Sequence, residues 1–324
     1  MLKRFLILSL FLPVIISSCI YFFLTTNNDS KSQPSLINAQ YVVSVFQELF
    51  ESESSFGKEK PNSDSVIPWG IEKVISPFIP SDNFGSGVKI AILDSGIDKN
   101  HEDLKSSVAG EFNAISPNTP VIDDLGHGTN VAGIISAQNN DVGIIGIAPG
   151  AELYSIKVLD EFGYGELSHI QEAIEWCIDN KIQIINMSFG IEEDKVELRN
   201  AINKAINANI VVVAAAGNSS NGSVEYPAAY DEVISVTAVD KENNIASFSP
   251  NGKIDFAAPG VDILTTTTNN SYRSYNGTSL ATAHISGIVS LILQYSQQLG
   301  IEKNDTFLHE KVYEILLDMS EDSS

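Results

Sequence analysis

The chain has 324 residues, of which 43% are hydrophobic and 19% are charged, so it is long and apolar enough to bury a large core. Its net charge of -22 disfavours nucleic acid as a partner, because a polyanion would be repelled, and favours a cationic peptide. Cys19 and Cys177 are the only two cysteines, which rules out a disulfide framework, and we expect Cys177 to be a buried thiol on a helix.

The N-terminus is typical of an exported protein. Lys3 and Arg4 precede an apolar run over residues 5–24. The tetrapeptide Ile-Ser-Ser-Cys that ends at Cys19 resembles a bacterial lipobox, which would make Cys19 a lipidated first residue. The run continues past Cys19 to a total of roughly 20 residues, which is enough for an uncleaved membrane anchor, and we favour the anchor. Either ending places the rest of the chain outside the cytoplasm.

The remaining chain divides into a polar stretch, one domain and a short tail. Residues 25–64 are rich in Asn, Ser, Lys and Glu, which predicts a tether or short propeptide with a short helix within residues 41–50. We expect a single globular domain over residues 65–320 and a tail at residues 321–324. No internal repeat interrupts this domain.

Strand and helix patterns alternate along the domain. Short apolar runs typical of buried strands lie at residues 88–93, 153–158, 182–187, 210–214 and 233–236. Helical spacing of apolar residues lies within residues 167–178, 198–206 and 308–317. This alternation predicts an α/β fold with a mostly parallel central sheet and helices on both faces. In such sheets the functional groups gather at the carboxyl ends of the strands.

Four polar side chains stand at predicted strand ends or helix starts. Asp94 ends one strand in Leu-Asp-Ser-Gly, and Asn218 ends another in Ala-Gly-Asn. His127 opens a helix in His-Gly-Thr, and Ser279 opens another in Gly-Thr-Ser. Each alone has an ordinary structural role as a cap or turn residue, but together they are an acid, a base, a nucleophile and an amide donor.

These four groups suit acyl transfer. A serine hydroxyl becomes a good nucleophile when a base takes its proton, and a histidine does so near neutral pH. A carboxylate fixes the histidine tautomer and stabilises the imidazolium. The tetrahedral oxyanion then needs donors, which the N-terminus of the Ser279 helix and the Asn218 amide would supply.

The segments around Asp94, His127 and Ser279 resemble the three signatures of the subtilisin-like serine peptidases, in that family's chain order. Residues 182–190, 210–218 and 257–260 also resemble family segments, so the resemblance runs from about residue 68 to about residue 320. It implies a monomeric serine endopeptidase that hydrolyses peptide bonds through an acyl-enzyme intermediate. The family usually has Pro where this chain has Ala283, which we expect to be harmless in a helix.

The resemblance also implies a first substrate pocket. Its walls would be formed by Ser188, Phe189 and Gly190, and by Ala215, Ala216 and Gly217, and its base would be Glu225. Family members commonly carry a small residue at the base. A carboxylate there would select Arg or Lys before the cut, because a guanidinium pairs with it bidentately. The alternative is a solvated loop glutamate that points away from the pocket.

A loop over residues 138–144, before the second predicted strand, resembles the family's principal calcium site. The pattern would give side-chain oxygens from Asp103 and Asn140, with carbonyls from Gln138, Val142 and Ile144. Hard cations prefer such a set of oxygens. The alternative is a polar surface turn, for which Asn-Asn-Asp is ordinary chemistry.

Two other functions compete with an active peptidase. One is an inactive family member that only binds peptides, against which the complete set of four groups argues. The other is an esterase or lipase of the α/β-hydrolase kind, which needs Gly-x-Ser-x-Gly and the order Ser, Asp, His, whereas here the serine comes last. A small, exported and anchored member also resembles the peptidases that trim leaders from lantibiotic precursors. We expect surface roles for His101, His169 and His309, and a His284 side chain that points away from Ser279.

Overall fold

The computed structural model describes residues 33–52, 65–76, 78, 80–301 and 308–321. The predictions for residues 1–24, including Cys19, lie outside this part. None of the helices in these ranges is long and apolar enough to cross a membrane. The described residues belong to one compact unit, Gln33–Ser324.

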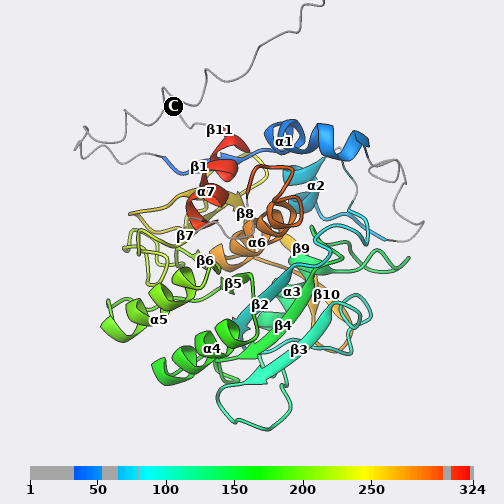
Figure 1. The fold of residues 1–324 in the computed structure, drawn as a ribbon. Coiled ribbons are helices and arrows are strands. Elements are labelled where there is room, and N and C mark those ends of the chain that lie inside the picture. The colour runs from blue at the N-terminus through cyan, green and yellow to red at the C-terminus, as the bar shows by residue number, and fades with distance from the viewer. Residues whose placement is uncertain (1–32, 53–64, 77, 79, 302–307, 322–324) are drawn as a thin grey trace, which may run out of the picture. The chain divides into compact units, whose positions relative to one another are not determined.

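A nine-stranded sheet forms the centre of this unit (Figure 1). Its neighbouring strands are parallel except for the pair at one edge, β1 and β11. The order across the sheet is β11 (Ser320–Glu321), β1 (Ser35–Ile37), β8 (Phe256–Pro259), β7 (Ile234–Val239), β6 (Val211–Ala215), β5 (Ile184–Met187), β2 (Lys89–Asp94), β4 (Glu152–Lys157) and β3 (Val108–Asn113). A separate hairpin joins β9 (Ile263–Thr267) to β10 (Ser271–Tyr275).

Helices cover both faces of the sheet, as the sequence pattern predicted. One face carries α1 (Ala39–Ser52), α2 (Trp69–Ile75), α3 (His127–Ser136), α6 (Thr278–Gln294) and α7 (Leu308–Asp318). The other face carries α4 (Leu167–Asp179) and α5 (Val196–Asn207). All five predicted strands are present, as are the helices predicted from apolar spacing within residues 167–178, 198–206 and 308–317. Strand β3 was missed because its sequence, Val-Ala-Gly-Glu-Phe-Asn, has no apolar run.

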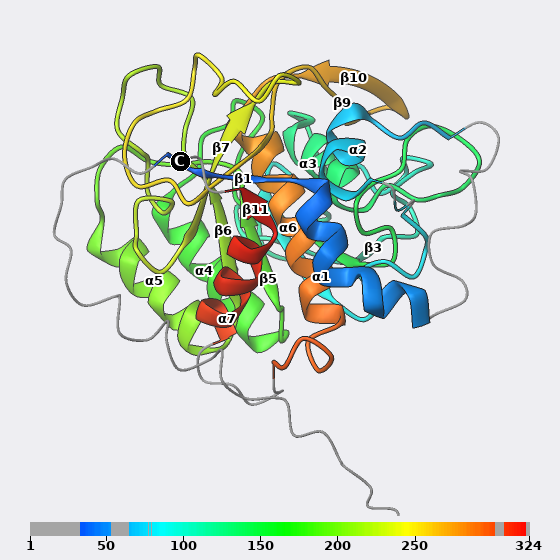
Figure 2. The same cartoon turned by 90° about the horizontal axis from the view of Figure 1, so that it is seen from above.

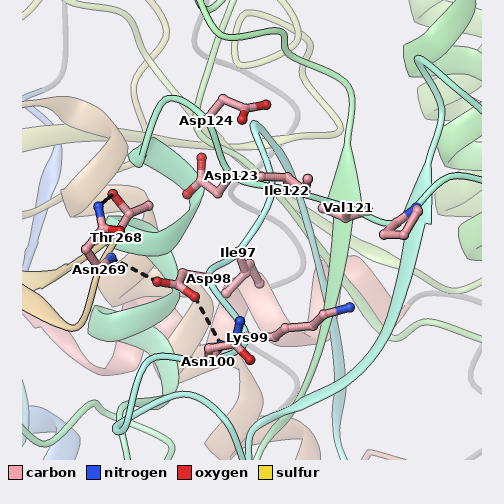
Figure 3. A pocket seen from close by; sticks show the side chains of 11 residues that line it. Ile97, Asp98, Lys99, Asn100, Val121, Ile122, Asp123, Asp124, Thr268 and Asn269 are labelled. Carbon is pink, nitrogen blue, oxygen red and sulfur yellow. Dashed lines mark hydrogen bonds between the residues drawn. The ribbon is translucent and has the colours of Figure 1, made fainter.

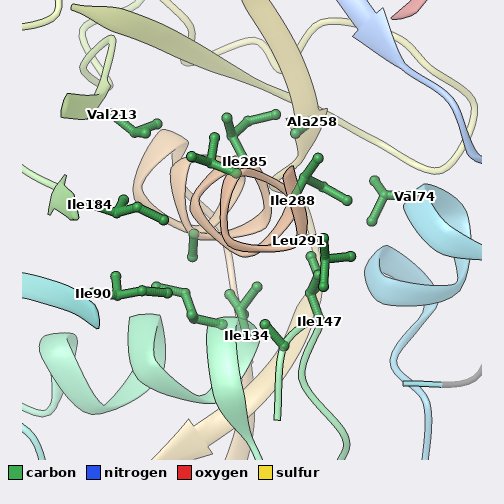
Figure 4. Close-up of a cluster of buried hydrophobic side chains, with 14 of the residues drawn as sticks. Val74, Ile90, Ile134, Ile147, Ile184, Val213, Ala258, Ile285, Ile288 and Leu291 are labelled. Carbon is green, nitrogen blue, oxygen red and sulfur yellow. The ribbon is translucent and has the colours of Figure 1, made fainter. Parts of the chain in front are cut away.

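Alternate side chains along each central strand enter two different cores. Ile90 and Ile92 of β2 pack with α3 and α6, while Ala91 and Leu93 pack with α4. Helix α6 is buried from Thr278 to Leu293, which explains its apolar residues on every side. Figure 4 shows Ile285, Ile288 and Leu291 of this helix surrounded by side chains from strands and other helices. The helix that carries the predicted nucleophile in its first turn is therefore buried along its length in the core.

The N-terminal segment differs from the predicted tether. Strand β1 pairs with β8, and Ile37, Val42 and Phe46 are buried in the same core as α6. The helix expected within residues 41–50 is α1, which lies beside α2 (Figure 2). Residues 35–52 are thus part of the domain, and β11 extends into the predicted tail at Glu321. The sequence could not reveal this, because β1 has three residues and its partners lie more than 200 positions away.

Candidate active site

The predicted site residues follow strands that are neighbours in the sheet. From β2 the chain proceeds to β3 and β4 on one side, and then to β5, β6 and β7 on the other. This reversal creates a crevice at the carboxyl edge, which is where α/β sheets bind ligands. Asp94 ends β2, Ser188 follows β5, and Asn218 lies three residues after β6.

Asp94 and His127 form a close pair at this edge. The Nδ1 atom of His127 lies 2.8 Å from Oδ1 and 2.9 Å from Oδ2 of Asp94. The Asp94 side chain is fully buried, whereas that of His127 is 30% exposed. A carboxylate only accepts hydrogen bonds, so Nδ1 carries the proton and Nε2 of the neutral ring keeps its lone pair. His127 is thereby oriented to accept a proton at Nε2.

The surroundings of His127 also change its basicity. Burial alone would lower the pKa of the imidazole, because the charged form loses its hydration. The charge and hydrogen bond of Asp94 and the charge of Asp123 outweigh burial and raise the pKa of His127 above its ordinary value. The ring is therefore a stronger base than a free histidine.

Gly128 allows helix α3 to approach the end of β2. A methyl group on Gly128 would lie 2.0 Å from the carbonyl oxygen of Gly96 and 3.1 Å from Cβ of Asp94. No side chain fits at that distance, so only glycine lets the neighbouring His127 reach Asp94. The glycine after the histidine is thus part of the geometry of the pair.

Asp123 is a buried carboxylate that the sequence reasoning missed. It accepts hydrogen bonds from Ser95 Oγ (2.7 Å), from the Gly126 N–H (2.7 Å), and from both the N–H and the hydroxyl of Thr129. It therefore binds free N–H groups at the start of α3 and complements the helix dipole. Ser95 in turn donates to Asp94 through its N–H (2.7 Å). An Asp in a short polar turn before a predicted helix is the available sequence signal.

A buried lysine joins the loops on either side of this network. Lys157, at the end of β4, donates through Nζ to the carbonyls of Ser95 (2.7 Å) and Ile122 (2.9 Å). Its ammonium group lies 3.5 Å from the carboxylate of Asp124. This cation fixes the segments that carry both Ser95 and Asp123.

Ser279 is the second residue of α6, and the helix N-cap is Gly277. Its hydroxyl donates to the Ser188 carbonyl at 2.8 Å, and the Ser188 hydroxyl donates to the Ser279 carbonyl at 3.0 Å. Asn186 donates to Ser188 Oγ at 2.9 Å and accepts from Ser286 Oγ at 2.8 Å. These buried polar contacts attach the start of α6 to the end of β5.

The Asn218 side chain is held by one end only. Its Oδ1 accepts from the N–H of Thr278 at 2.9 Å and from the Thr278 hydroxyl at 3.2 Å. Nothing in the described part of the chain accepts from its Nδ2 group. The amide therefore offers a free N–H next to the start of α6, where Ser279 lies.

The segments predicted to form a substrate pocket also meet here. Ser188, Phe189 and Gly190 follow β5, while Ala215 ends β6 and Gly217 follows it. The Glu225 N–H donates to the Ala216 carbonyl at 3.0 Å, which brings Glu225 beside Gly217.

The predicted calcium-binding residues lie together as well. Asp103 Oδ2 accepts from the Ile144 N–H at 2.9 Å, and Oδ1 lies 3.3 Å from Asn140 Nδ2. The N–H of Gln138 donates to the Asp103 carbonyl at 2.9 Å, while the Val142 carbonyl accepts from Ser65 Oγ at 3.1 Å. Burial raises the pKa of the Asp103 carboxyl and outweighs the hydrogen bonds from Ile144, Tyr272 and Asn140 and the charge of His101, which lower it. No cluster of three or more His, Cys, Asp or Glu that could hold a metal occurs in these ranges.

Two of the other histidines are buried. His101 is fully buried, with Nε2 3.1 Å from the Ser271 carbonyl, so the expected surface role was wrong. It packs edge-on against Tyr272, which a lone histidine in a turn does not reveal. His284 binds the Leu280 carbonyl through Nδ1 at 2.8 Å, and burial lowers its pKa to about 4. Cys177 is buried in α4, as predicted.

A pocket of about 450 Å³ lies next to Asp123 (Figure 3). Its lining includes Ile97, Asp98 and Asn269 but none of Asp94, His127 and Ser279. The Asp98 carboxylate is engaged by the N–H groups of Asn100 (3.1 Å) and Asn269 (3.0 Å). The pocket therefore lies outside the Asp94–His127 pair, and backbone N–H groups already bind the Asp98 carboxylate in its lining.

A carboxylate–imidazole pair and a helix-borne serine at the carboxyl edge of a parallel sheet are the groups that serine hydrolases use. The model of the subtilase family matches residues 85–317, which is more than half of the chain. The chain belongs to the subtilase family.

Individual relatives agree with this assignment. Alkaline elastase YaB of Bacillus sp. (strain YaB) is 43% identical over 231 residues, or 71% of this chain and 60% of its own. Subtilisin E of Bacillus subtilis (strain 168) is 45% identical over 233 residues, or 70% of this chain and 61% of its own. Subtilisin of Bacillus pumilus is 44% identical over 233 residues, or 70% of this chain and 84% of its own. The chain thus spans less than two thirds of the length of the first two.

The Asp123 carboxylate should contribute to the basicity of His127. Replacing Asp123 by Asn removes one negative charge near the ring, so the pKa of His127 should fall. NMR titration of the His127 ring protons, assigned with a His127→Gln variant, measures the shift. The half-exposed Asp124 offers the matched control, because Asp124→Asn removes the same charge from the next residue. An equal shift in both variants would contradict a specific role for Asp123.

Proposed function

We propose that the protein is a serine endopeptidase with Asp94, His127 and Ser279 as its catalytic triad. The observation that carries this proposal is the contact of His127 Nδ1 with both oxygens of buried Asp94, at the sheet edge where the Ser279 helix begins. The family assignment supports the same chemistry. The Asn218 amide and the Ser279 N–H are the proposed donors to the oxyanion.

The reaction follows from these positions. The Ser279 hydroxyl turns from the Ser188 carbonyl, passes its proton to His127 Nε2, and its oxygen attacks the carbonyl carbon of the peptide bond. The resulting oxyanion accepts hydrogen bonds from Asn218 Nδ2 and the Ser279 N–H, while Asp94 stabilises the imidazolium. His127 then gives its proton to the leaving amine, which leaves an acyl-enzyme. A water molecule, deprotonated by His127, hydrolyses that ester and restores Ser279.

Ser279→Ala should abolish peptide hydrolysis and leave the fold intact. Gly277 is the N-cap, so the substitution removes only the bond to Ser188 and should cost about 1 kcal/mol of unfolding free energy. Hydrolysis of an unfolded protein substrate and urea unfolding of both proteins measure the two effects. More than a trace of remaining activity would contradict the assignment of the nucleophile.

We further propose that the enzyme acts outside the cytoplasm, where the N-terminal segment holds it at a membrane. The support is the basic start at Lys3 and Arg4 and the apolar run over residues 5–24. In that place it would process an exported precursor peptide as a monomer. The mass of the N-terminal peptide of the membrane-extracted protein distinguishes a lipidated Cys19 from an uncleaved membrane anchor, because only lipidation adds acyl chains at Cys19.

We also infer a structural calcium site at the loop over residues 138–144. The support is the buried carboxylate of Asp103, which is the kind of ligand that hard cations prefer. The Asn140 side chain lies beside it and turns its Nδ2 group toward Asp103 Oδ1 at 3.3 Å, so a cation would bind after this amide has rotated. The carbonyls of Gln138, Val142 and Ile144 are the remaining candidates. A bound cation would offset the cost of burying the Asp103 charge and would join residue 103 to the loop.

Calcium should therefore raise the thermal midpoint of unfolding, and a chelator should lower it. At about 100 times the dissociation constant the native state gains roughly 2.7 kcal/mol, which corresponds to several degrees. The Asp103→Asn variant should lose this response. Asp141→Asn is the matched control, because it removes an exposed charge from the same loop at a positive φ of 69° that Asn tolerates. An unchanged midpoint in wild type with calcium or chelator would contradict the site.

A further inference from the structure

The carboxylate of Glu225 occupies the space between Gly190 and Gly217. Gly190 lies two residues after Ser188, whose carbonyl accepts from the Ser279 hydroxyl. A methyl group on Gly190 would lie 2.6 Å from Oε2 of Glu225. On the other side, a methyl group on Gly217 would lie 2.7 Å from Oε1 of Glu225. Both carboxylate oxygens thus fill the room that the missing side chains leave open.

The backbone holds Glu225 in this place. Its N–H donates to the Ala216 carbonyl at 3.0 Å. The next residue, Tyr226, exchanges two hydrogen bonds of 2.8 Å with Ile191, which follows Gly190 directly. Glu225 is therefore fixed between the segments after β5 and β6, and its side chain does not point away from them.

This carboxylate has no cationic partner in the part of the chain that the structure describes. Burial raises the pKa of Glu225, and the exposed Glu192 raises it further, while a hydrogen bond from Ser219 lowers it. The first two cations after Glu192 in the sequence form other ion pairs, Lys195 with Glu193 and Arg199 with Asp194. Glu225 is thus a half-buried anion next to a second anion.

We infer that Glu225 is the specificity-determining residue of the proposed peptidase and selects peptides with arginine, and next lysine, immediately before the cleaved bond. The inference rests on the proposed function, because Glu225 can select a substrate only if the peptide bond is cleaved at Ser279. It follows from position: a side chain that enters between Gly190 and Gly217 from a peptide bound at Ser279 meets the Glu225 carboxylate.

Arginine is the side chain that best matches the Glu225 carboxylate. The two carboxylate oxygens match the fork of a guanidinium, whereas an ammonium group cannot pair with them bidentately. A partly dry carboxylate gains more from such a partner than a solvated one does. The net charge of -22 adds attraction for cationic peptides, which weakens as salt is added.

Three peptides that differ only before the cut test this inference. One carries arginine, one carries citrulline, which is the neutral isostere, and one carries phenylalanine. For wild type, kcat/KM should be about 10- to 100-fold higher for arginine than for citrulline, as expected for hydrogen bonds to a charged group. In Glu225→Gln the ratio should fall to about 1. Glu192→Gln removes a neighbouring charge of the same sign outside the pocket and should keep most of the preference.

The outcomes separate the inference from the proposed function. The inference would be overturned by faster cleavage after phenylalanine than after arginine, or by an unchanged ratio of kcat/KM for arginine to that for citrulline in Glu225→Gln. Hydrolysis of any of the peptides would still support the proposed peptidase. Should no peptide be hydrolysed, the proposed function fails, and calorimetric binding of peptides that end in arginine or citrulline to Ser279→Ala decides on the pocket. Tighter binding of the arginine peptide supports the role of Glu225, and equal binding overturns it. Glu225→Ala gives the same comparison where Glu225→Gln does not fold.

Discussion

The close approach of helix α3 to the end of strand β2 is the constraint on which the site depends. Only a glycine at position 128 lets the helix backbone come near the Gly96 carbonyl, and this approach places the His127 ring on the Asp94 carboxylate. Asp123 and Lys157 stabilise the approach from two sides, one by binding the start of α3 and the other by holding the loops. The basicity of His127 follows from the same geometry, since the carboxylates of Asp94 and Asp123 both raise the pKa of its ring.

The second half of the site depends on the burial of helix α6. A helix that is apolar on all sides has one stable place, between the central strands and the outer helices of one face. Its start is then attached to β5 by the reciprocal bonds of Ser188 and Ser279, and to the segment after β6 by Asn218. The proposed nucleophile, the proposed oxyanion donors and the Glu225 carboxylate are positioned by helix α6 and by the ends of strands β5 and β6.

The sequence predicted the parts with strong local patterns. Buried parallel strands are continuous apolar runs, and residues at their carboxyl ends meet, so Asp94 and Asn218 could be expected at one edge of the sheet. The roles of Asp94, His127, Ser279 and Asn218 were predicted from the resemblance to the subtilisin-like peptidases. The sequence could not predict that β1 and β11 complete the sheet edge, because their partners are distant and the flanking residues are polar. Asp123 was missed because a lone Asp in a turn has no distinguishing pattern until Ser95 and Thr129 surround it. The orientation of Glu225 was undecided for the same reason, since pocket and solvent differ only in three dimensions.

Covalent labelling tests the central claim most directly, namely that His127 activates Ser279. A fluorophosphonate probe reacts only with an activated serine, and peptide mass spectrometry locates the adduct. The account predicts one adduct, on Ser279, and its loss in His127→Ala. The absence of an adduct in the folded wild-type protein, an adduct on another residue, or undiminished labelling of His127→Ala would contradict it.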